Sequence, residues 1–310
     1  MYTINNVTVI IRSVGERTEQ LCKKLILDQE IPEKNIFIIR ERPFSTAMKV
    51  SYQTGLDNKL PWTFCVDADV LLKEDAVQDM LRIAKDEPEH VFGVSGKLLD
   101  KYFGAQRAAG NYLFRTKHLI HLINSILPYE EENIRPESSI FKSIQNKGLI
   151  LKKKQICIGL HDFEQHNHDI SRKAFTHSQK HSEFISEFVT FWQQSANHDL
   201  DYLIALFGLS KGIMRNKDVK INTENFADLY DEVNTRYGLK SNQIEDFKIK
   251  SSKDIHKAIC NRDYYFKPDV KLAQLRDKKF RLKFNEMNYR DLMKRFGSKL
   301  KIDFSKLHKL

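Results

Sequence analysis

The sequence has few cysteines and no long apolar stretch, and these absences exclude several kinds of protein. Its four cysteines are scattered and form no CxxC pair. This pattern favours reduced thiols in a cytoplasmic protein over a disulfide framework or a cysteine–zinc site. No apolar run reaches about 18 residues, so we expect no transmembrane helix. The first residues lack the basic segment and cleavage site of a secretory signal, so we expect no signal peptide.

Glycine-rich phosphate-binding motifs are also missing. Neither GxGxxG nor GxxxxGK(S/T) occurs among the 12 glycines, which disfavours a Rossmann dinucleotide site and a P-loop. His177 and His181 are four residues apart and could share one helical turn, but the glutamate of the HExxH zinc motif is absent. A packed or solvated histidine pair is therefore favoured over a zinc site. We expect His166 and His168 to lie at the surface.

The composition is that of a globular protein with an uneven charge distribution. Of the 310 residues, 41% are hydrophobic and 30% are charged, and the net charge is +10. Residues 267–310 contain 14 Lys and Arg against 5 Asp and Glu, a local balance of +9. Apolar residues interrupt this basic tail, so it is a candidate for binding an anionic membrane surface or a nucleic acid. The alternative is a charged helical appendage docked on the main domain.

The most informative segment is Pro61–Val70, PWTFCVDADV. An apolar run, Trp62–Val66, ends in Asp67-Ala68-Asp69, and residues 73–84 then carry apolar residues at helical spacing. This pattern predicts a buried strand that presents two carboxylates at its C-terminal edge, followed by a helix. Asp67 and Asp69 can face one site, where a hard divalent cation such as Mn²⁺ or Mg²⁺ would offset their repulsion. The alternative is a solvated turn without metal.

Further elements follow the same strand–helix pattern. Strands are predicted at Val7–Val14, Asn35–Pro43 and Val91–Leu99, and helices after Arg17 and at Ser45–Leu56. Such repeats predict an α/β fold with a parallel sheet and helices on both faces. Open sheets of this kind bind ligands at the carboxyl ends of their strands.

The middle of the chain supplies further candidate site residues. Gly104–Leu119 combines small residues with a strand-like NYLFR segment, which would allow close approach of the backbone to a ligand. Arg135–Gly148 predicts a helix with Glu137 in its first turn, where the carboxylate would at least stabilise the helix N-terminus. Gln155–Leu160 predicts a strand that ends in His161-Asp162. Beyond His166 the apolar residues recur mainly at helical spacing, which predicts helices in this part of the chain.

The order of these motifs resembles that of the GT-A fold glycosyltransferases. The matching segments are VTVIIRSVGERTEQL, FCVDADVLLKEDAVQDML, AAGNYLFRTKHL, RPESSIFKSIQNKG and IGLHDFEQ, which together span Val7–Gln165, about half of the chain. The resemblance implies a GT-A-like, Rossmann-like, mixed and mostly parallel sheet flanked by helices. We accordingly expect a nucleotide-sugar-binding and catalytic domain at residues 1–180. A helical C-terminal region would follow at 181–310, with the basic extension at 267–310.

The resemblance also implies roles for individual residues. The candidates for binding the nucleotide sugar are Arg12, Glu16, Arg40, Lys49 and Asp67. The candidate ligands of Mn²⁺ or Mg²⁺ are Asp67, Asp69 and His161. A divalent cation held there would neutralise the charge that develops on the diphosphate leaving group.

Two departures from the usual inverting pattern affect these assignments. The second strand ends in Arg40-Glu41-Arg42 where the family usually has an aspartate, so the identity of the nucleotide stays open. The helix that usually begins with an E-D pair begins here with Pro136-Glu137-Ser138, so the catalytic base is either Glu137 or Asp162. Inversion with Glu137 as base is favoured. A retaining mechanism, which needs no dedicated base, is the alternative.

These observations predict a metal-dependent glycosyltransferase that moves a sugar from a UDP- or GDP-sugar to a hydroxyl of a glycan or lipid-linked acceptor. It would be cytoplasmic, with peripheral contact to the inner membrane face through the basic tail. One alternative is a sugar-nucleotide nucleotidyltransferase, which would normally carry a glycine-rich N-terminal signature. Another is a non-catalytic nucleic-acid-binding protein, but the excess charge is confined to one end, which makes nucleic acid the less favoured partner.

Overall fold

The computed structural model describes residues 3–126, 136–214 and 247–260, together with Leu229, Asp231, Glu232 and Thr235. The predicted basic extension, 267–310, lies outside the described residues. The strands are β1 (Val7–Arg12), β2 (Ile36–Ile39), β3 (Trp62–Asp67), β4 (Val70–Leu72), β5 (Val91–Asp100), β6 (Ala105–Arg107), β7 (Asn111–Arg115) and β8 (Ile150–His161). The α-helices are α1 (Glu19–Leu27), α2 (Phe44–Asp57), α3 (Ala76–Lys85), α4 (Leu119–Ile123), α5 (Pro136–Gln145), α6 (Asn167–Lys180), α7 (Ile185–Ser195), α8 (Leu200–Met214) and α10 (Ser252–Cys260). Short 3₁₀ helices lie at Ile4–Asn6, Glu33–Asn35, Thr116–His118 and Ser182–Phe184.

The strands form one mixed sheet with the order β2-β1-β3-β7-β5-β8-β4, and β6 pairs with β5. β1 pairs in parallel with β2 and β3, and β5 pairs in parallel with β8. β7 lies between β3 and β5 and is antiparallel to both. β1, β2, β3, β5 and β8 therefore run in one direction, which agrees with the predicted mixed sheet.

The sheet is not parallel throughout. The predicted fourth strand, β5, does not pair with β3, because β7 follows it in the chain and inserts between the two. A further strand, β4, begins directly after Asp69 and pairs antiparallel with β8, where only a connection to the next helix was expected. Hydrophobic periodicity identifies strands but does not specify their partners, which explains both differences.

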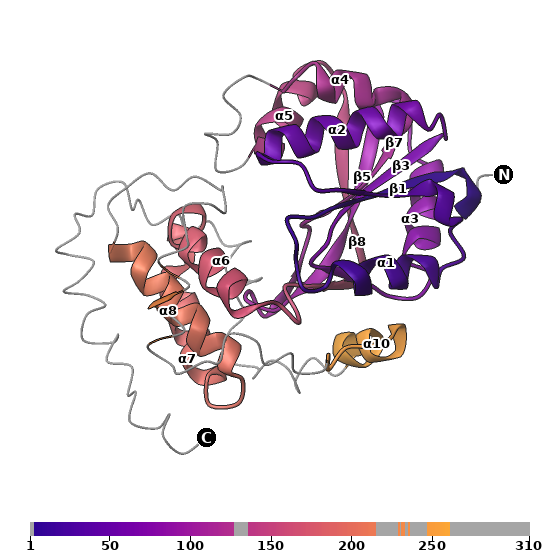
Figure 1. Ribbon diagram of the computed structural model, residues 1–310. Coiled ribbons are helices and arrows are strands. Elements are labelled where there is room, and N and C mark those ends of the chain that lie inside the picture. The colour runs from indigo at the N-terminus through magenta and orange to yellow at the C-terminus, as the bar shows by residue number, and fades with distance from the viewer. Residues whose placement is uncertain are drawn as a thin grey trace.

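Helices cover both faces of the sheet (Figure 1). α2, α4 and α5 lie on one face, and α1 and α3 lie on the other. β1 is buried along its whole length, so its side chains alternate between the two cores. Ile10 packs in the core that contains Met48 and Tyr52 of α2, whereas Val9 and Ile11 pack in the core of α1 and α3.

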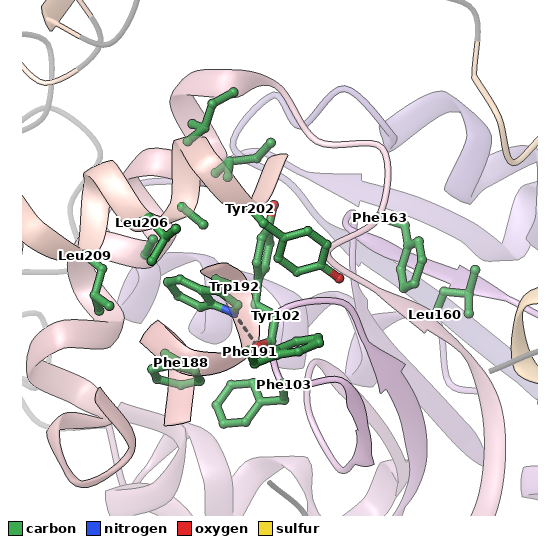
Figure 2. Close-up of a cluster of buried hydrophobic side chains, with 14 of the residues drawn as sticks. Tyr102, Phe103, Leu160, Phe163, Phe188, Phe191, Trp192, Tyr202, Leu206 and Leu209 are labelled. Atoms are coloured by element: carbon green, nitrogen blue, oxygen red, sulfur yellow. Dashed lines mark hydrogen bonds between the residues drawn. The ribbon is translucent and has the colours of Figure 1, made fainter. Parts of the chain in front are cut away.

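Helices α6, α7 and α8 form a group beside the sheet (Figure 1). Their aromatic residues pack on the segment that follows β5, and the indole Nε1 of Trp192 donates a hydrogen bond to the carbonyl oxygen of Tyr102 at 2.8 Å (Figure 2). The division of the chain at residue 180 stays a prediction, and α6 and α8, which lie on opposite sides of it, belong to one hydrophobic cluster. Within the described residues, none of the helices has the length and apolar character needed to cross a bilayer.

Candidate active site

Four strands that run in the same direction end in polar residues at one edge of the sheet. Arg12 and Asp67 are register partners at the ends of β1 and β3. Asp100 and His161 are register partners at the ends of β5 and β8. The carboxyl edge is where open α/β sheets bind their ligands, because the helices that follow the strands leave a crevice there. The sheet thus brings two of the predicted ligands, Asp67 and His161, to the same edge.

Arg12 joins two of the predicted site residues. Its Nε donates to Oδ1 of Asp67 at 2.8 Å, and its Nη1 donates to Oε1 of Glu137 at 2.5 Å. The Arg12 side chain is buried, whereas the two carboxylates that it contacts are partly exposed. Burial, with the nearby Asp69 and Glu137, raises the pKa of Asp67 to about 7, although the charge of Arg12 acts in the opposite direction. Arg12 therefore holds the β3 carboxylate and the first turn of α5 together.

Gly110 packs closely against the backbone and the other carboxylate oxygen of Asp67. The Gly110 carbonyl accepts a hydrogen bond from the Asp67 backbone N–H at 2.9 Å. Gly110 has a φ of +55°, and a Cβ placed on it would lie 2.7 Å from Oδ2 of Asp67. Only glycine combines this backbone conformation with so close an approach. The sequence predicted a close approach of Gly104–Leu119 to a ligand, which stays a prediction; in the structure Gly110 of this segment lies against Asp67.

A compact group of Asp69, His161 and Asp162 lies beside Asp67. Each of the three residues offers one potential ligand atom, and these atoms lie within 4.8 Å of one another. β4 and β8 hold the group together, because Val70, next to Asp69, is the register partner of His161. Among the described residues this is the set that could hold a metal ion, and it contains Asp162 in place of Asp67.

The chemistry of this group fits a divalent cation. Asp69 is 7% exposed, and its Oδ1 is buried without a hydrogen-bond partner, 3.7 Å from Nε2 of His161. His161 Nδ1 lies 2.8 Å from Oδ2 of Asp100. Once a metal displaces the proton on Nε2, a carboxylate on Nδ1 would hold the remaining proton there and keep Nε2 directed toward the metal, as is usual for metal-binding histidines. A buried carboxylate oxygen without a partner requires a cation or a donor, and this one faces Nε2.

The electrostatic state of the group follows from its burial and its neighbours. Burial lowers the pKa of His161, but the charges of Asp162 and Asp69 outweigh this effect and raise it to about 10. Burial raises the pKa of Asp162, but His161 and Lys173 together hold it well below its usual value. Asp162 also has a φ of 65°, a region that non-glycine residues seldom occupy. Strained backbone of this kind is characteristic of functional sites.

Sequence reasoning missed two charged members of this site. The apolar pattern predicts that the fourth strand ends at Leu99, yet β5 extends to Asp100. Lys173, on α6, contacts Oδ2 of Asp69 and Oδ1 of Asp162 through its ammonium group. The position of Asp100 at the end of an apolar run, like that of Asp67, was an available signal. Lys173 is one lysine of an amphipathic helix, and no sequence pattern sets it apart.

The remaining nucleotide-binding candidates are more dispersed. Glu16 lies in the loop after β1, where its Oε2 accepts hydrogen bonds from Ser13 Oγ at 2.9 Å and from the Val14 N–H at 2.7 Å. Arg40 forms a bidentate ion pair with Glu19, and its side chain is 57% exposed. Lys49 lies on an exposed face of α2. Within the described part of the chain, neither Arg40 nor Lys49 forms a hydrogen bond or an ion pair with the Asp69–His161–Asp162 group.

The histidine pair at the C-terminal end of α6, His177 in the helix and His181 directly after it, is packed. His177 and His181 are buried, and their rings lie 5.2 Å apart, edge to face. The His177 ring also stacks on Phe188 at 5.6 Å, and burial lowers its pKa to about 3. His166 and His168 are exposed, as expected.

A segment from the C-terminal region lies against the loop that follows β8. Oε1 of Glu164 accepts hydrogen bonds from the backbone N–H groups of Lys248 and Ile249 at 3.1 and 3.2 Å. The guanidinium of Arg17, in the loop after β1, lies over the Phe247 ring at 4.6 Å. Residues 247–249 therefore contact both loops that border the site, a relationship that the sequence does not reveal.

Comparisons with known proteins give little further information. No family model matches the chain. A search of curated proteins found no significant match. One matching solved structure is described as a glycosyltransferase involved in the glycosylation of the major capsid of PBCV-1. It shares 9% sequence identity and a TM-score of 0.37, over 48% of this chain and 82% of that one. A likeness at this level is too low to carry an argument about fold or function.

Proposed function

We propose that this protein is a glycosyltransferase that moves a sugar from a nucleotide sugar to an acceptor hydroxyl. The observation that carries the proposal is the convergence of Asp67, Asp69, His161 and Asp162 at the carboxyl edge of the sheet. Arg12 links Asp67 to Glu137, so a further carboxylate stands next to this group. We propose that one part of the site holds a diphosphate through a cation and that Glu137 acts on the acceptor.

In this proposal Asp69, His161 and Asp162 hold the divalent cation, Mn²⁺ or Mg²⁺. When bound, the cation supplies positive charge to the nucleoside diphosphate as it leaves. Asp69 offers its unpartnered Oδ1, and Asp100 holds His161 with Nε2 toward Asp69. Asp67, which was also predicted as a ligand, is paired with Arg12 and is better suited to the ribose hydroxyls of the donor.

Glu137 is the proposed catalytic base. A base must take the proton of the acceptor hydroxyl as that oxygen attacks the sugar, and it needs a lone pair directed at the acceptor. Asp162, the alternative, is 1% exposed and is engaged by both His161 and Lys173. The Glu137 side chain is 17% exposed and receives one hydrogen bond from Arg12 at its Oε1. This contrast favours Glu137, and with it an inverting transfer.

The loop after β1 is the proposed nucleotide-binding segment. Glu16 stabilises this loop through Ser13 and Val14, and the loop lies next to the end of β3. We assign a UDP- or GDP-sugar as donor and a glycan or lipid-linked hydroxyl as acceptor. We also assign the basic tail, 267–310, to contact with an anionic membrane at its cytoplasmic face.

A panel of nucleotide sugars tests this function. We expect one donor to raise the melting temperature in the presence of Mn²⁺, because a ligand that binds only the folded state stabilises it. Slow hydrolysis of that donor should require Mn²⁺ and be lost in Asp69→Asn, while Asp57→Asn, at an exposed position on α2, should behave as the wild type. No response to any donor would contradict the proposal. Pyrophosphate release from a nucleoside triphosphate and a sugar phosphate would instead identify a nucleotidyltransferase.

A further inference from the structure

Lys173 reaches from α6 into the candidate metal group. Its ammonium contacts Oδ2 of Asp69 and Oδ1 of Asp162, and it lies 3.5 Å from Oε1 of Gln165. The Lys173 side chain is 15% exposed, so these contacts are largely shielded from water. The ammonium therefore lies where two carboxylates converge, and the same negative charge would attract a divalent cation.

The lysine satisfies this pair of carboxylates only in part. Oδ2 of Asp69 accepts a hydrogen bond from the Lys173 ammonium. Oδ1 of Asp69 is buried without a hydrogen-bond partner and lies 3.7 Å from Nε2 of His161. Leaving a buried carboxylate oxygen unpaired is unfavourable. A cation that bonded Asp69 and His161 together would satisfy it. The structure thus shows two carboxylates that Lys173 and the nearby His161 ring partly neutralise, and an Asp69 oxygen that still lacks a hydrogen bond.

We propose that Lys173 is a built-in competitor for the metal, which holds the carboxylates of Asp69 and Asp162 together in the metal-free protein and leaves them when a divalent cation binds. The inference rests on the metal role proposed above. An ammonium and a divalent cation on the same two carboxylates repel each other, and burial strengthens this repulsion because little water screens it.

The lysine side chain is suited to such an exchange. Its flexible four-carbon stem lets the ammonium move while α6 stays in place. Burial and the charge of Asp69 raise the pKa of Glu16, and the charge of Lys173 opposes this effect. In this inference Glu16 is the new partner of the displaced ammonium. Glu16 belongs to the loop after β1, the proposed nucleotide-binding segment, so a displaced Lys173 would add positive charge where donor phosphates would bind.

A fixed lysine would behave in the opposite way. If Lys173 stayed in contact with both carboxylates while the metal was bound, its role would be to position them. Its removal would then weaken metal binding, whereas removal of a competitor strengthens it. The sign of the change in metal affinity therefore separates the two roles.

The test is a calorimetric titration of Mn²⁺ alone into the full chain. For Lys173→Met we expect a Kd at least tenfold lower than that of the wild type. Lys173→Gln should show the same direction if the methionine variant fails to fold. Lys173→Arg, which keeps the positive charge, should bind no more tightly than the wild type. Lys101→Met is the matched control, because Lys101 is also a buried lysine between two carboxylates, those of Asp199 and Asp201, but is not part of this group. Its Mn²⁺ affinity should be unchanged.

Equal or weaker Mn²⁺ binding by the folded Lys173→Met and Lys173→Gln proteins would overturn the inference. So would a failure of wild type and variants alike to bind Mn²⁺ at millimolar concentration. The titration contains neither donor nor acceptor, so its result is independent of whether the protein transfers sugars. The nucleotide-sugar panel decides that question separately.

Discussion

Asp100 and His161 are register partners on the parallel strands β5 and β8, and Oδ2 of Asp100 lies 2.8 Å from Nδ1 of His161. Asp100 is completely buried and also forms an ion pair with Arg107 at 2.6 Å. Oδ1 of Asp100 accepts hydrogen bonds from the backbone N–H groups of Tyr102 and Phe103, both at 3.0 Å. Asp100 is therefore fixed in position by the fold, and it in turn fixes the ring of His161.

Replacing Asp100 by asparagine tests this orienting role. The amide oxygen can still accept the hydrogen bonds of the backbone N–H groups. The carboxylate oxygen beside Nδ1 is lost, so the tautomer that leaves Nε2 available to a metal is no longer stabilised. Loss of such an outer partner typically weakens metal binding about 10–100-fold. We expect a change of this size in the Mn²⁺ Kd, measured by calorimetry. Asp79→Asn, which removes an ion-pair partner of Lys73 and Arg82, is the control. An unchanged Kd in Asp100→Asn would remove Asp100 from the site.

Gly110→Ala should disturb Asp67 directly. The added Cβ would lie 2.7 Å from Oδ2 of Asp67, so the carboxylate must move, and the positive φ adds strain of about 1–3 kcal/mol. We expect lower stability and weaker binding of the donor, measured by chemical denaturation and calorimetry. Gly148→Ala is a matched control, because Gly148 also has a positive φ, +82°, but a Cβ added there would meet no atom within 4 Å. Equal donor affinity in the two variants would exclude a role for the Asp67 carboxylate position.

Glu137→Gln separates catalysis from binding. Glutamine can still accept the hydrogen bond from Arg12, so the link to Asp67 should persist, but it cannot take the proton of an acceptor hydroxyl. General-base catalysis typically contributes about 10²–10⁴ in rate, and we expect kcat for transfer to fall by that factor while the Kd of the donor stays the same. Glu33→Gln, at the exposed ion pair with Lys23, is the control. Undiminished turnover would eliminate Glu137 as the base.

The buried His177 predicts a dependence of stability on pH. Burial lowers its pKa to about 3 from an ordinary value near 6.5. The folded state therefore holds His177 neutral at pH 5, whereas the unfolded chain takes up a proton there. The stability that the folded state gains by keeping His177 neutral is fully present above pH 6.5 and is lost as the pH falls toward 3. Between pH 7 and pH 5 the loss amounts to about 2 kcal/mol.

His177→Phe should remove this part of the pH dependence, because phenylalanine can stack on Phe188 and Phe103 without titrating. The free energy of unfolding, measured in urea at pH 7 and pH 5, should therefore fall less in the variant than in the wild type. His198→Gln, at an exposed position, should leave the difference unchanged. An identical fall in wild type and His177→Phe would show that His177 is not held neutral.

The sequence predicted the longer strands and the edge at which the site lies, because buried strands have clear apolar runs, but it did not predict the three-residue strands β4 and β6. Trp62–Val66 ends at Asp67, and Gln155–Leu160 ends at His161, as the structure shows. The antiparallel insertion of β7 was not predictable in this way, since strand pairing depends on contacts between segments that are distant in the chain. For the same reason Asp162 and not Asp67 joins Asp69 and His161, because the pairing of β4 with β8 determines which carboxylates meet.

The charged residues around the site illustrate a second limit of sequence reasoning. Lys173 lies 104 residues from Asp69 in the chain, and its role depends on how α6 packs after the loop at the end of β8. Arg12 was identified as a candidate for the nucleotide, but its pairing with both Asp67 and Glu137 required the fold. Arg40, by contrast, is paired with Glu19 on α1, 21 residues away in the chain, a partner that motif matching does not consider.

The central claim is that Asp69, His161 and Asp162 bind a divalent cation at the carboxyl edge of the sheet. Anomalous diffraction from crystals grown with Mn²⁺ tests it most directly. We predict a manganese peak bonded to Oδ1 of Asp69 and Nε2 of His161, with Asp162 as the third protein ligand. A map without a peak between these residues, or with manganese bound elsewhere, would contradict the account.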